Sequence, residues 1–311
     1  MNERKIEANG IRLHLVEQGE GPLVLFLHGW PESWYSWRHQ LAAVAAAGYH
    51  AVAIDVRGYG QSDAPHAIEA YAMKELVADA IGVLDALGEK EAVVVGHDWG
   101  SAIAWTCAAL HPERFRAVVG MSVPHLGRSP APPTTLFRKL FAEQWFYILY
   151  FQEPGVAEAE LEADYNRSVR GILAGHGFGL TKPPGSGFLT GLTIPTQLPP
   201  WLTEEDVAIF AHELARHGFR GPLNRYRNMD RDWEELPELA TKSIEIPALF
   251  VIGDRDPTGK LASQEPMKKL VPDLEIVTLE GAGHWIQQER PGEVNATLLA
   301  FLARLPGRML G

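Results

Sequence analysis

Short apolar runs recur along the first part of the chain, separated by stretches in which apolar residues follow a helical spacing. Ile11, Leu13 and Leu15 alternate with polar residues, which predicts a strand with one buried face. Continuous apolar runs are typical of strands in a parallel sheet that is covered on both faces. Four such runs come early and two strand patterns come late: Leu23–Leu27, Ala51–Ile54, Ala92–Val95 and Ala117–Met121, then Ala248–Ile252 and Leu274–Leu279.

Helical patterns lie between these predicted strands. Apolar residues of the segment Leu76–Leu87 share one helix face, and Gly88 follows as a C-terminal stop. The segment Gly100–Leu110 is apolar nearly all round, so we expect a buried helix there. A closing amphipathic helix is predicted around Val294–Leu302.

The alternation of strands and helices stops between residues 127 and 243. Pro- and Gly-rich stretches there separate helical patterns, one over Val156–Val169 and another starting at the capping residue Thr203. We interpret the acidic residues of the first pattern as a solvated face: Glu158, Glu160, Glu162 and Asp164.

The order of these elements predicts the fold class. We expect an α/β fold with a mostly parallel, doubly wound sheet, formed by residues 1–126 and completed by residues 244–311. Residues 127–243 are then a helical lid inserted over the carboxyl ends of the strands, where such sheets bind their ligands.

Composition limits the classes of partner. The net charge of −11 argues against nucleic acid and against an anionic membrane surface, because both attract clustered Lys and Arg. No apolar run is long enough to cross a bilayer, and the polar first ten residues lack the apolar core of a signal peptide. The only cysteine, Cys107, has no partner for an internal disulfide. We therefore expect a cytoplasmic protein without membrane insertion. A homodimer is an expectation that no sequence feature tests.

The clearest chemical signal is Gly96-His97-Asp98-Trp99-Gly100, between a predicted strand and the predicted buried helix. A G-x-nucleophile-x-G sequence at a strand-to-helix turn is the nucleophile elbow of α/β-hydrolases. The turn is so tight that a β-carbon at either glycine would clash with neighbouring backbone. The central residue is Asp98, placed at a helix N-terminus that favours an anion. The alternative is an ordinary strand-end turn in which Asp98 only caps the helix.

A second motif, His28-Gly29-Trp30-Pro31, follows the Leu23–Leu27 strand. In this fold the loop after that strand supplies one backbone N–H of an oxyanion hole, and the residue after the nucleophile supplies the other. We therefore expect the N–H groups of Trp30 and Trp99 to form the oxyanion hole. A cis peptide bond before Pro31 is expected to shape the loop.

An acid and a histidine follow the lid in the order that the fold requires. Asp256 comes just after the Ala248–Ile252 strand, and His284 comes after the Leu274–Leu279 strand. Asp254 is the main alternative for the acid. We prefer Asp256 because a longer loop beyond the strand is needed to reach the histidine.

Other motifs predict no cofactor and no metal. The segment Gly58–Asp63 resembles a dinucleotide loop but lacks the third glycine and the helix that should follow. The histidines show neither an H-E-x-x-H motif nor a Cys/His ligand spacing. We interpret the side chains of His28 and His97 as hydrogen-bonded structural groups.

With these motifs the chain resembles the soluble epoxide hydrolases of the α/β-hydrolase superfamily over nearly its whole length. The matching stretches in the predicted core are the residues from His28 to Trp37, Asp55 to Ser62, Gly96 to Gly100 and Gly283 to Trp285. Two lid stretches, Tyr147 to Gly155 and Gly218 to Asn228, are more specific to this family. In the family, one tyrosine from each lid stretch points at the epoxide oxygen.

The resemblance implies that Tyr147 and Tyr226 are these two tyrosines. Tyr150, one helical turn after Tyr147, is the nearest competitor, and each tyrosine could also be a half-buried aromatic residue with a satisfied hydroxyl. The implied substrate is a small, mostly apolar epoxide. Asp98 would attack it as a carboxylate, and the phenols would protonate the leaving oxygen. His284, oriented by Asp256, would then activate water against the Asp98 ester.

Two other functions remain open at this stage. A haloalkane dehalogenase would share the carboxylate nucleophile and the His–Asp pair, but it would need halide-binding N–H groups in place of the phenols. Paired lid tyrosines, and the lack of an Asn after His28-Gly29, count against it. A ligand receptor on the same scaffold could keep the triad and turn over poorly, and only a multiple-turnover assay would distinguish it. A serine esterase is excluded because the elbow has no serine.

Overall fold

The computed structural model describes residues 1–175, 182–261 and 265–306 of the chain. The chain forms two compact units, which we call the sheet unit and the helical unit. The sheet unit comprises Met1–Val56, Val77–Gly127 and Glu238–Gly311. The helical unit comprises Arg57–Leu76 and Arg128–Pro237. It therefore overlaps the predicted insertion, residues 127–243, whose boundaries stay a prediction.

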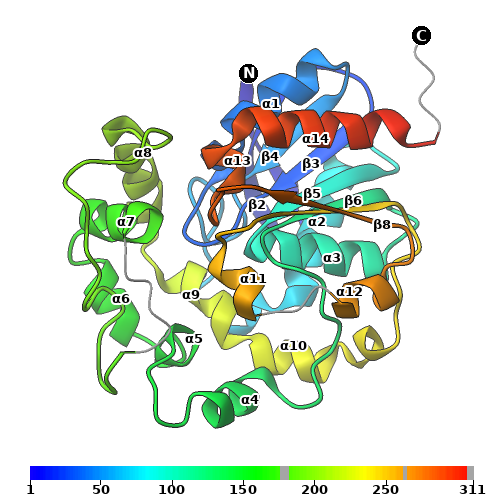
Figure 1. Cartoon of the computed structure of the whole chain (residues 1–311). Coiled ribbons are helices and arrows are strands. Elements are labelled where there is room, and N and C mark those ends of the chain that lie inside the picture. Colours follow the sequence, from blue (N-terminus) through cyan, green and yellow to red (C-terminus); the bar gives the residue numbers. More distant parts are fainter. Residues whose placement is uncertain (176–181, 262–264, 307–311) are drawn as a thin grey trace. The chain divides into compact units, whose positions relative to one another are not determined.

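The sheet unit is built on an eight-stranded sheet with the order β1-β2-β4-β3-β5-β6-β7-β8 (Figure 1). Its strands are β1 (Asn2–Ala8), β2 (Ile11–Gln18), β3 (Leu23–Leu27), β4 (His50–Ile54), β5 (Ala92–His97), β6 (Phe115–Met121), β7 (Ala248–Gly253) and β8 (Leu274–Leu279). Strand β2 pairs antiparallel with β1 and β4, and the other neighbours are parallel. The predicted α/β class with a mostly parallel sheet is confirmed. Strand β1 was not predicted, because its first residues are exposed and polar.

Helices cover both faces of this sheet. They are η1 (Trp34–Trp37), α1 (Arg38–Ala46), α2 (Met73–Leu87, which begins in the helical unit), α3 (Trp99–Leu110), α11 (Pro257–Leu261), α12 (Glu265–Leu270), α13 (Ile286–Glu289) and α14 (Pro291–Arg304). Figure 1 shows α1, α13 and α14 on one face and α2 and α3 on the other. Trp37, Leu41, Leu298 and Phe301 bury the first face together with Phe26 of β3. Burial on both faces explains why the central strands read as continuous apolar runs.

Every described segment of the helical unit is helix, turn or irregular chain, apart from one isolated bridge residue. Its elements are η2 (Glu69–Tyr71), α4 (Pro133–Leu140), α5 (Tyr147–Tyr150), α6 (Val156–Leu161), α7 (Tyr165–Ala174), α8 (Glu204–Ala215), α9 (Arg220–Arg227) and α10 (Met229–Glu235), with η3 (Pro237–Ala240) at the border of the two units. The predicted start of α8 is confirmed, because Thr203 accepts a hydrogen bond from the Asp206 N–H.

Two expectations for this unit are wrong. The predicted helix over Val156–Val169 is two helices, because Asp164 caps the start of α7 through the Arg167 N–H. The acids of this segment also do not form a solvated face. Glu158 is buried against Arg227, and Glu162 accepts the Phe219 N–H at 2.7 Å. Their partners lie far away in sequence, so the local pattern resembled an exposed acidic helix.

Cys107 lies buried in α3. Among the residues that the structure describes, no helix is both long enough and apolar enough to cross a membrane.

Candidate active site

Asp98 occupies a strained turn between β5 and α3. Its φ of 52° and ψ of −118° lie in a region that side-chain-bearing residues rarely adopt. A β-carbon at Gly96 would lie 2.0 Å from the Gly100 carbonyl oxygen, and one at Gly100 would lie 2.0 Å from the Leu27 carbonyl oxygen. Both glycines are therefore required, and the close packing around them holds Asp98 in its strained conformation.

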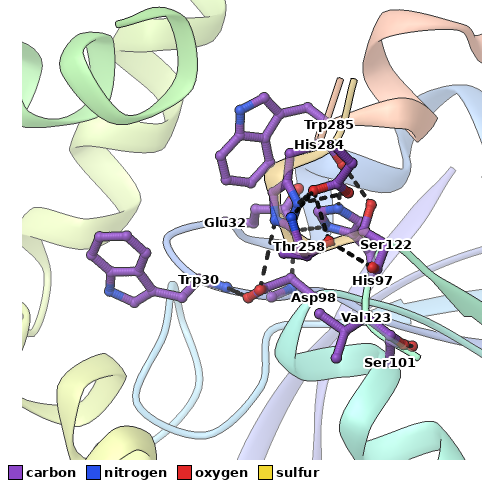
Figure 2. A network of polar contacts seen from close by, with 12 residues as sticks. Trp30, Glu32, His97, Asp98, Ser101, Ser122, Val123, Thr258, His284 and Trp285 are labelled. Carbon is purple, nitrogen blue, oxygen red and sulfur yellow. Dashed lines mark hydrogen bonds and ion pairs between the residues drawn. The ribbon is translucent and has the colours of Figure 1, made fainter. Parts of the chain in front are cut away.

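The Asp98 carboxylate meets a backbone donor on one side and an imidazole on the other (Figure 2). Its Oδ1 accepts the Trp30 N–H at 2.8 Å, and its Oδ2 lies 3.6 Å from His284 Nε2. The two carboxylate oxygens therefore have different surroundings. The side chain is 17% exposed, which leaves it accessible to a small molecule.

The loop before Trp30 packs directly on the nucleophile turn. A β-carbon at Gly29 would lie 2.4 Å from the Asp98 β-carbon, so only glycine allows this approach. The Trp30-Pro31 peptide bond is cis, as predicted. The His28 side chain is hydrogen-bonded as expected, because its Nε2 accepts the Val56 N–H at 3.0 Å.

His284 is held by a bidentate contact with Asp256. Its Nδ1 lies 3.0 Å from each Asp256 carboxylate oxygen. Asp256 is buried, and Oδ1 also accepts the N–H and the hydroxyl of Thr258 at 2.8 and 2.7 Å. The alternative acid, Asp254, is exposed and instead accepts the Gly281 N–H. Asp256 therefore fixes the imidazole so that Nε2 faces Asp98.

Electrostatics favour the charged forms of this pair. Burial alone would lower the pKa of His284, but the Asp256 and Asp98 carboxylates together raise the pKa well above its ordinary value. Burial likewise acts to raise the pKa of Asp256, and the neighbouring His284 and Thr258 lower it overall. In the free protein His284 therefore favours the imidazolium form, bonded to the Asp256 carboxylate.

Tyr147 and Tyr226, the predicted lid acids, lie together in the helical unit. Tyr147 is the first residue of α5 and Tyr226 lies near the end of α9, with ring centroids 6.0 Å apart and planes at 80°. Phe151 contacts both rings, at centroid distances of 5.6 and 5.1 Å. Gln152 joins the two helices by donating to the carbonyl oxygens of Ile148 and Tyr226. Tertiary packing thus brings together two phenols that are far apart in sequence.

Tyr150, the competing tyrosine, is bonded elsewhere. Its hydroxyl donates to Glu160 Oε2 at 2.8 Å. Burial and the Glu160 carboxylate both raise the pKa of Tyr150, which strengthens its hold on the proton. The same carboxylate accepts the N–H groups of Phe188 and Leu189 at 2.6 and 2.9 Å. Tyr150 therefore belongs to the hydrogen-bond network around Glu160 inside the helical unit.

Sequence reasoning did not single out Glu32, although its carboxylate organises the surroundings of the site. Glu32 is buried, and its carboxylate bonds to the loop at Gly29 and to His97. The only local signal was an acidic residue directly after Pro31, the last residue of the second motif. Trp99, the other predicted oxyanion donor, is the first residue of α3, next to Asp98.

No metal site accompanies this arrangement in the described part of the chain. Within it, no group of three or more His, Cys, Asp and Glu side chains is placed to hold a metal ion. The polar groups around Asp98 instead bond to one another, as Figure 2 shows.

A carboxylate on a strand-to-helix elbow, faced by a His–Asp pair, is the arrangement typical of an α/β-hydrolase. Consistent with this class, residues 22–291 match the family described as alpha/beta hydrolase fold. "Epoxide hydrolase A" of Mycobacterium tuberculosis is 46% identical over 97% of this chain and 98% of its own length.

Two further relatives agree with this comparison. The crystal structure of Epoxide Hydrolase A from Mycobacterium thermoresistibile is 48% identical, with a TM-score of 0.95 over 98% of both chains. "Bifunctional epoxide hydrolase 2" of Sus scrofa is 40% identical over 94% of this chain, which spans 53% of that longer protein. The chain belongs to the epoxide hydrolases of the α/β-hydrolase fold.

Proposed function

We propose that the protein converts epoxides and water to vicinal diols through a covalent ester on Asp98. The observation that carries this proposal is the unequal environment of the two Asp98 oxygens. Oδ1 accepts a hydrogen bond from the Trp30 N–H at 2.8 Å, whereas Oδ2 lies 3.6 Å from His284 Nε2. One oxygen is therefore placed to become an ester carbonyl in an oxyanion hole, and the other is available to attack carbon.

In the first step, Asp98 Oδ2 attacks an epoxide carbon and the carbon–oxygen bond of the ring breaks. A carboxylate is already ionised at neutral pH, so this attack needs no base. The leaving alkoxide requires an acid that stays protonated at neutral pH, and a phenol meets that requirement. We assign this role to Tyr147 and Tyr226, which share the developing charge. One of them transfers its proton to the oxygen.

In the second step, His284 acts as the base for a water molecule that attacks the carbonyl carbon of the ester. Esterification removes the negative charge of Asp98, and with it part of what raises the pKa of His284, so the ring more readily becomes the neutral imidazole that can accept a proton from water. The ester carbonyl oxygen, formerly Oδ1, becomes negatively charged during this attack. The Trp30 N–H stabilises that charge by donating a hydrogen bond, and the Trp99 N–H is the proposed second donor. The bond between the ester carbonyl carbon and the former Oδ2 oxygen then breaks, and the departing alkoxide takes the proton that His284 had accepted. The new Asp98 carboxylic acid releases its proton, which restores the phenol. The alkyl–oxygen bond stays intact, so the diol leaves with the oxygen that Asp98 supplied.

The choice of Tyr147 over Tyr150 has a physical basis. The Tyr150 hydroxyl donates a hydrogen bond to the Glu160 carboxylate. If Tyr150 gave its proton to a substrate, the phenolate would lie next to this carboxylate, and the two anions would repel each other. Tyr147 instead shares the aromatic cluster with Tyr226 and Phe151. Aromatic surroundings also suit a small, mostly apolar epoxide as the substrate.

A haloalkane dehalogenase is the second candidate that the triad alone would allow. The paired phenols favour the epoxide, since a halide leaves without needing a proton. A receptor with poor turnover is tested by multiple-turnover diol formation.

The histidine variant gives the sharpest test of the mechanism. His284→Gln should still be alkylated but should not hydrolyse the ester, so a covalent adduct should accumulate with the mass of one whole epoxide. A haloalkane would instead add only its alkyl group and release halide. Peptide mapping should place the adduct on Asp98. The absence of any adduct on this variant would reject the covalent mechanism.

Isotope labelling tests the same step in the wild type. A single turnover in heavy-oxygen water should place the label in the Asp98 carboxylate, because water attacks the ester carbonyl. Label that passes directly into the diol in the first turnover would indicate direct attack by water on the epoxide.

We also propose that the protein acts in the cytoplasm without binding nucleic acid, membranes or a cofactor. The net charge of −11 and the single, buried Cys107 support this proposal. Cell fractionation tests the location, and sedimentation analysis tests the expected homodimer.

A further inference from the structure

Glu32 is a buried carboxylate that accepts hydrogen bonds on both of its oxygens. Its side chain is shielded from solvent, with the residue 1% exposed. Oε2 accepts the Gly29 N–H at 3.0 Å and lies 2.6 Å from His97 Nδ1. Oε1 accepts the side-chain amides of Gln287 and Gln288 at 2.8 and 3.2 Å.

These donors come from three separate parts of the proposed catalytic machinery. Gly29 precedes Trp30, whose N–H binds Asp98. His97 precedes Asp98 at the end of β5, and Gln287 lies in α13, which begins two residues after His284. One carboxylate therefore holds together the oxyanion loop, the nucleophile turn and the segment that follows the histidine.

His97 completes this connection from its other ring nitrogen. Its Nε2 lies 2.8 Å from the His284 carbonyl oxygen, which also accepts the Ser122 hydroxyl at 2.8 Å (Figure 2). The rings of His97 and His284 are 4.9 Å apart between centroids. The backbone of His284 is thus fixed by contacts that are distinct from the Asp256 contact of its side chain.

Both contacts of the His97 ring join it to oxygens of other segments. The carbonyl oxygen of His284 only accepts, so His97 Nε2 donates to it. Burial acts to raise the pKa of Glu32, but the nearby His97 and other donors lower it to about 2, so Glu32 is a carboxylate. The Glu32–His97 pair is therefore a buried hydrogen-bonded pair that links the Gly29 N–H to the His284 carbonyl oxygen.

We propose that the hydrogen-bonded Glu32–His97 pair is a positioning device for the hydrolysis of the Asp98 ester, with a much smaller role in ester formation. This inference rests on the proposed two-step function. The second step needs three groups at fixed separations: the Trp30 N–H, His284 Nε2 and the attacking water. The Glu32–His97 pair connects the two protein segments that carry the first two groups.

Alkylation depends less on this connection. The Trp30 N–H binds the Asp98 carboxylate already in the ground state, so a displaced N–H affects reactant and transition state in similar ways. In hydrolysis the same N–H faces an oxygen that acquires a full negative charge, and a displaced donor then costs more. His284 acts as a base only in the second step.

The test measures the rate of ester formation and the rate of ester hydrolysis separately in a Glu32→Gln variant. A glutamine presents an NH₂ group to donors that need an acceptor, so the network loses bonds while the residue keeps its shape. Rapid-quench single turnover with a styrene oxide probe should show ester hydrolysis slowed by about 10–100-fold, the range for small misplacements of catalytic groups. Ester formation should change by less than about 3-fold, so the Asp98 ester should accumulate during steady-state turnover.

The chain offers a matched control in another buried histidine–carboxylate pair. His14 Nδ1 lies 2.7 Å from Asp55 Oδ2, with both side chains 1% or less exposed. This pair joins β2 to the end of β4 and to the Trp34 N–H. His14→Gln should lower thermal stability to a similar degree as Glu32→Gln, while the ratio of the two rates stays that of the wild type.

The possible outcomes are distinguishable. Equal slowing of both steps in Glu32→Gln would mean that Glu32 only supports the fold, and would overturn the inference. Unchanged rates would overturn it as well. If neither the wild type nor His284→Gln forms an ester, the proposed function fails and takes this inference with it. If ester forms normally and its hydrolysis is unaffected, the inference alone is wrong.

A measurement on the wild type keeps the inference testable if Glu32→Gln does not fold. Nitrogen-15 NMR of histidine-labelled protein should show that Nε2 of His97 carries a proton, as donation to the His284 carbonyl oxygen requires. A His97 ring with an unprotonated Nε2 would show that this link to His284 is absent and would overturn the inference.

Discussion

Asp98 and His284 in the sheet unit are fixed by backbone turns and charges, whereas Tyr147 and Tyr226 in the helical unit are fixed by the packing of aromatic rings. Asp98 depends on glycines whose β-carbons would clash at about 2 Å, and His284 on a bidentate carboxylate at 3.0 Å. The two tyrosine rings instead contact Phe151 and each other.

This difference matches the chemistry that we propose for each region. Attack by a nucleophile and proton transfer to a base depend steeply on distance and orientation. The nucleophile and the base therefore need rigid supports that allow few other conformations. A phenol that donates one hydrogen bond tolerates more adjustment. Aromatic packing also leaves the region around the phenols apolar, which suits the substrate. Changes in the sheet unit should therefore abolish individual steps, and changes in the helical unit should weaken them.

The largest effect should follow removal of the nucleophile. Asp98→Ala should lower diol formation by at least about 10⁴-fold, as expected for loss of a covalent nucleophile. Stability should not fall, because the substitution removes a side chain that is 17% exposed and not part of the core. Diol assays and thermal unfolding of the purified variant check both points. Substantial remaining turnover would contradict the whole assignment.

The lid phenols should give a smaller, graded loss. Tyr147→Phe and Tyr226→Phe should each slow alkylation by up to about 10²–10⁴-fold, the range for one positioned acid, with the remaining phenol reducing the loss. Tyr150→Phe is the control, since it removes the bond to Glu160 and leaves both proposed acids in place. Single-turnover rates of ester formation, measured for all three variants, distinguish the proposed acids from the control. A loss in Tyr150→Phe without one in Tyr147→Phe would mean that the two tyrosines were assigned wrongly.

A buried ion pair should hold the helical unit without supplying chemistry. Arg227 donates to both Glu158 oxygens at 2.7 and 3.0 Å, with side chains 3% and 10% exposed. Glu158→Gln leaves Arg227 without its counter-charge, which typically costs about 3–5 kcal/mol. Hydrogen exchange should increase in α5, α6 and α9 and remain unchanged in β5.

The control for this prediction is an exposed pair in the same unit. Arg170 bonds to Glu204, whose side chain is 69% exposed, so Glu204→Gln should cost only about 0–1 kcal/mol. If the two variants exchange at the same rate, the buried pair does not stabilise the helical unit.

The smallest effect concerns pH and stability. Because Asp256 and Asp98 hold the pKa of His284 above its unfolded value, despite burial, the folded state binds the extra proton more tightly. The resulting stabilisation is fully present below the unfolded pKa of about 6.5 and is lost as pH rises through the folded pKa. Thermal unfolding of the wild type should show a decrease in stability across that range. The decrease should be smaller in His284→Gln, and an identical pH profile would argue against the imidazolium.

Sequence reasoning located the strand ends that carry the proposed catalytic residues, because each motif is local. The elbow needs two glycines at a fixed distance from Asp98, and tight backbone contacts impose that requirement within five residues. Continuous apolar runs located the central strands for the same reason, since two buried faces require apolar residues at every position. Strand β1 was not predicted by this reasoning, because it lies at the end of the strand order next to β2 and exposes most of its side chains.

The sequence by itself determined the glycine-flanked turn at Asp98, the order of the proposed nucleophile, acid and base along the chain, and the α/β class. Local steric rules and the periodicity of burial carry that information. Tertiary structure decided which acid faces His284, which donors surround Glu32, and that Glu158 is buried against Arg227. It also showed that the Tyr150 hydroxyl donates its hydrogen bond to Glu160. Those contacts join residues from separate elements, and a single sequence does not encode the distance between two side chains that only the folded backbone brings together.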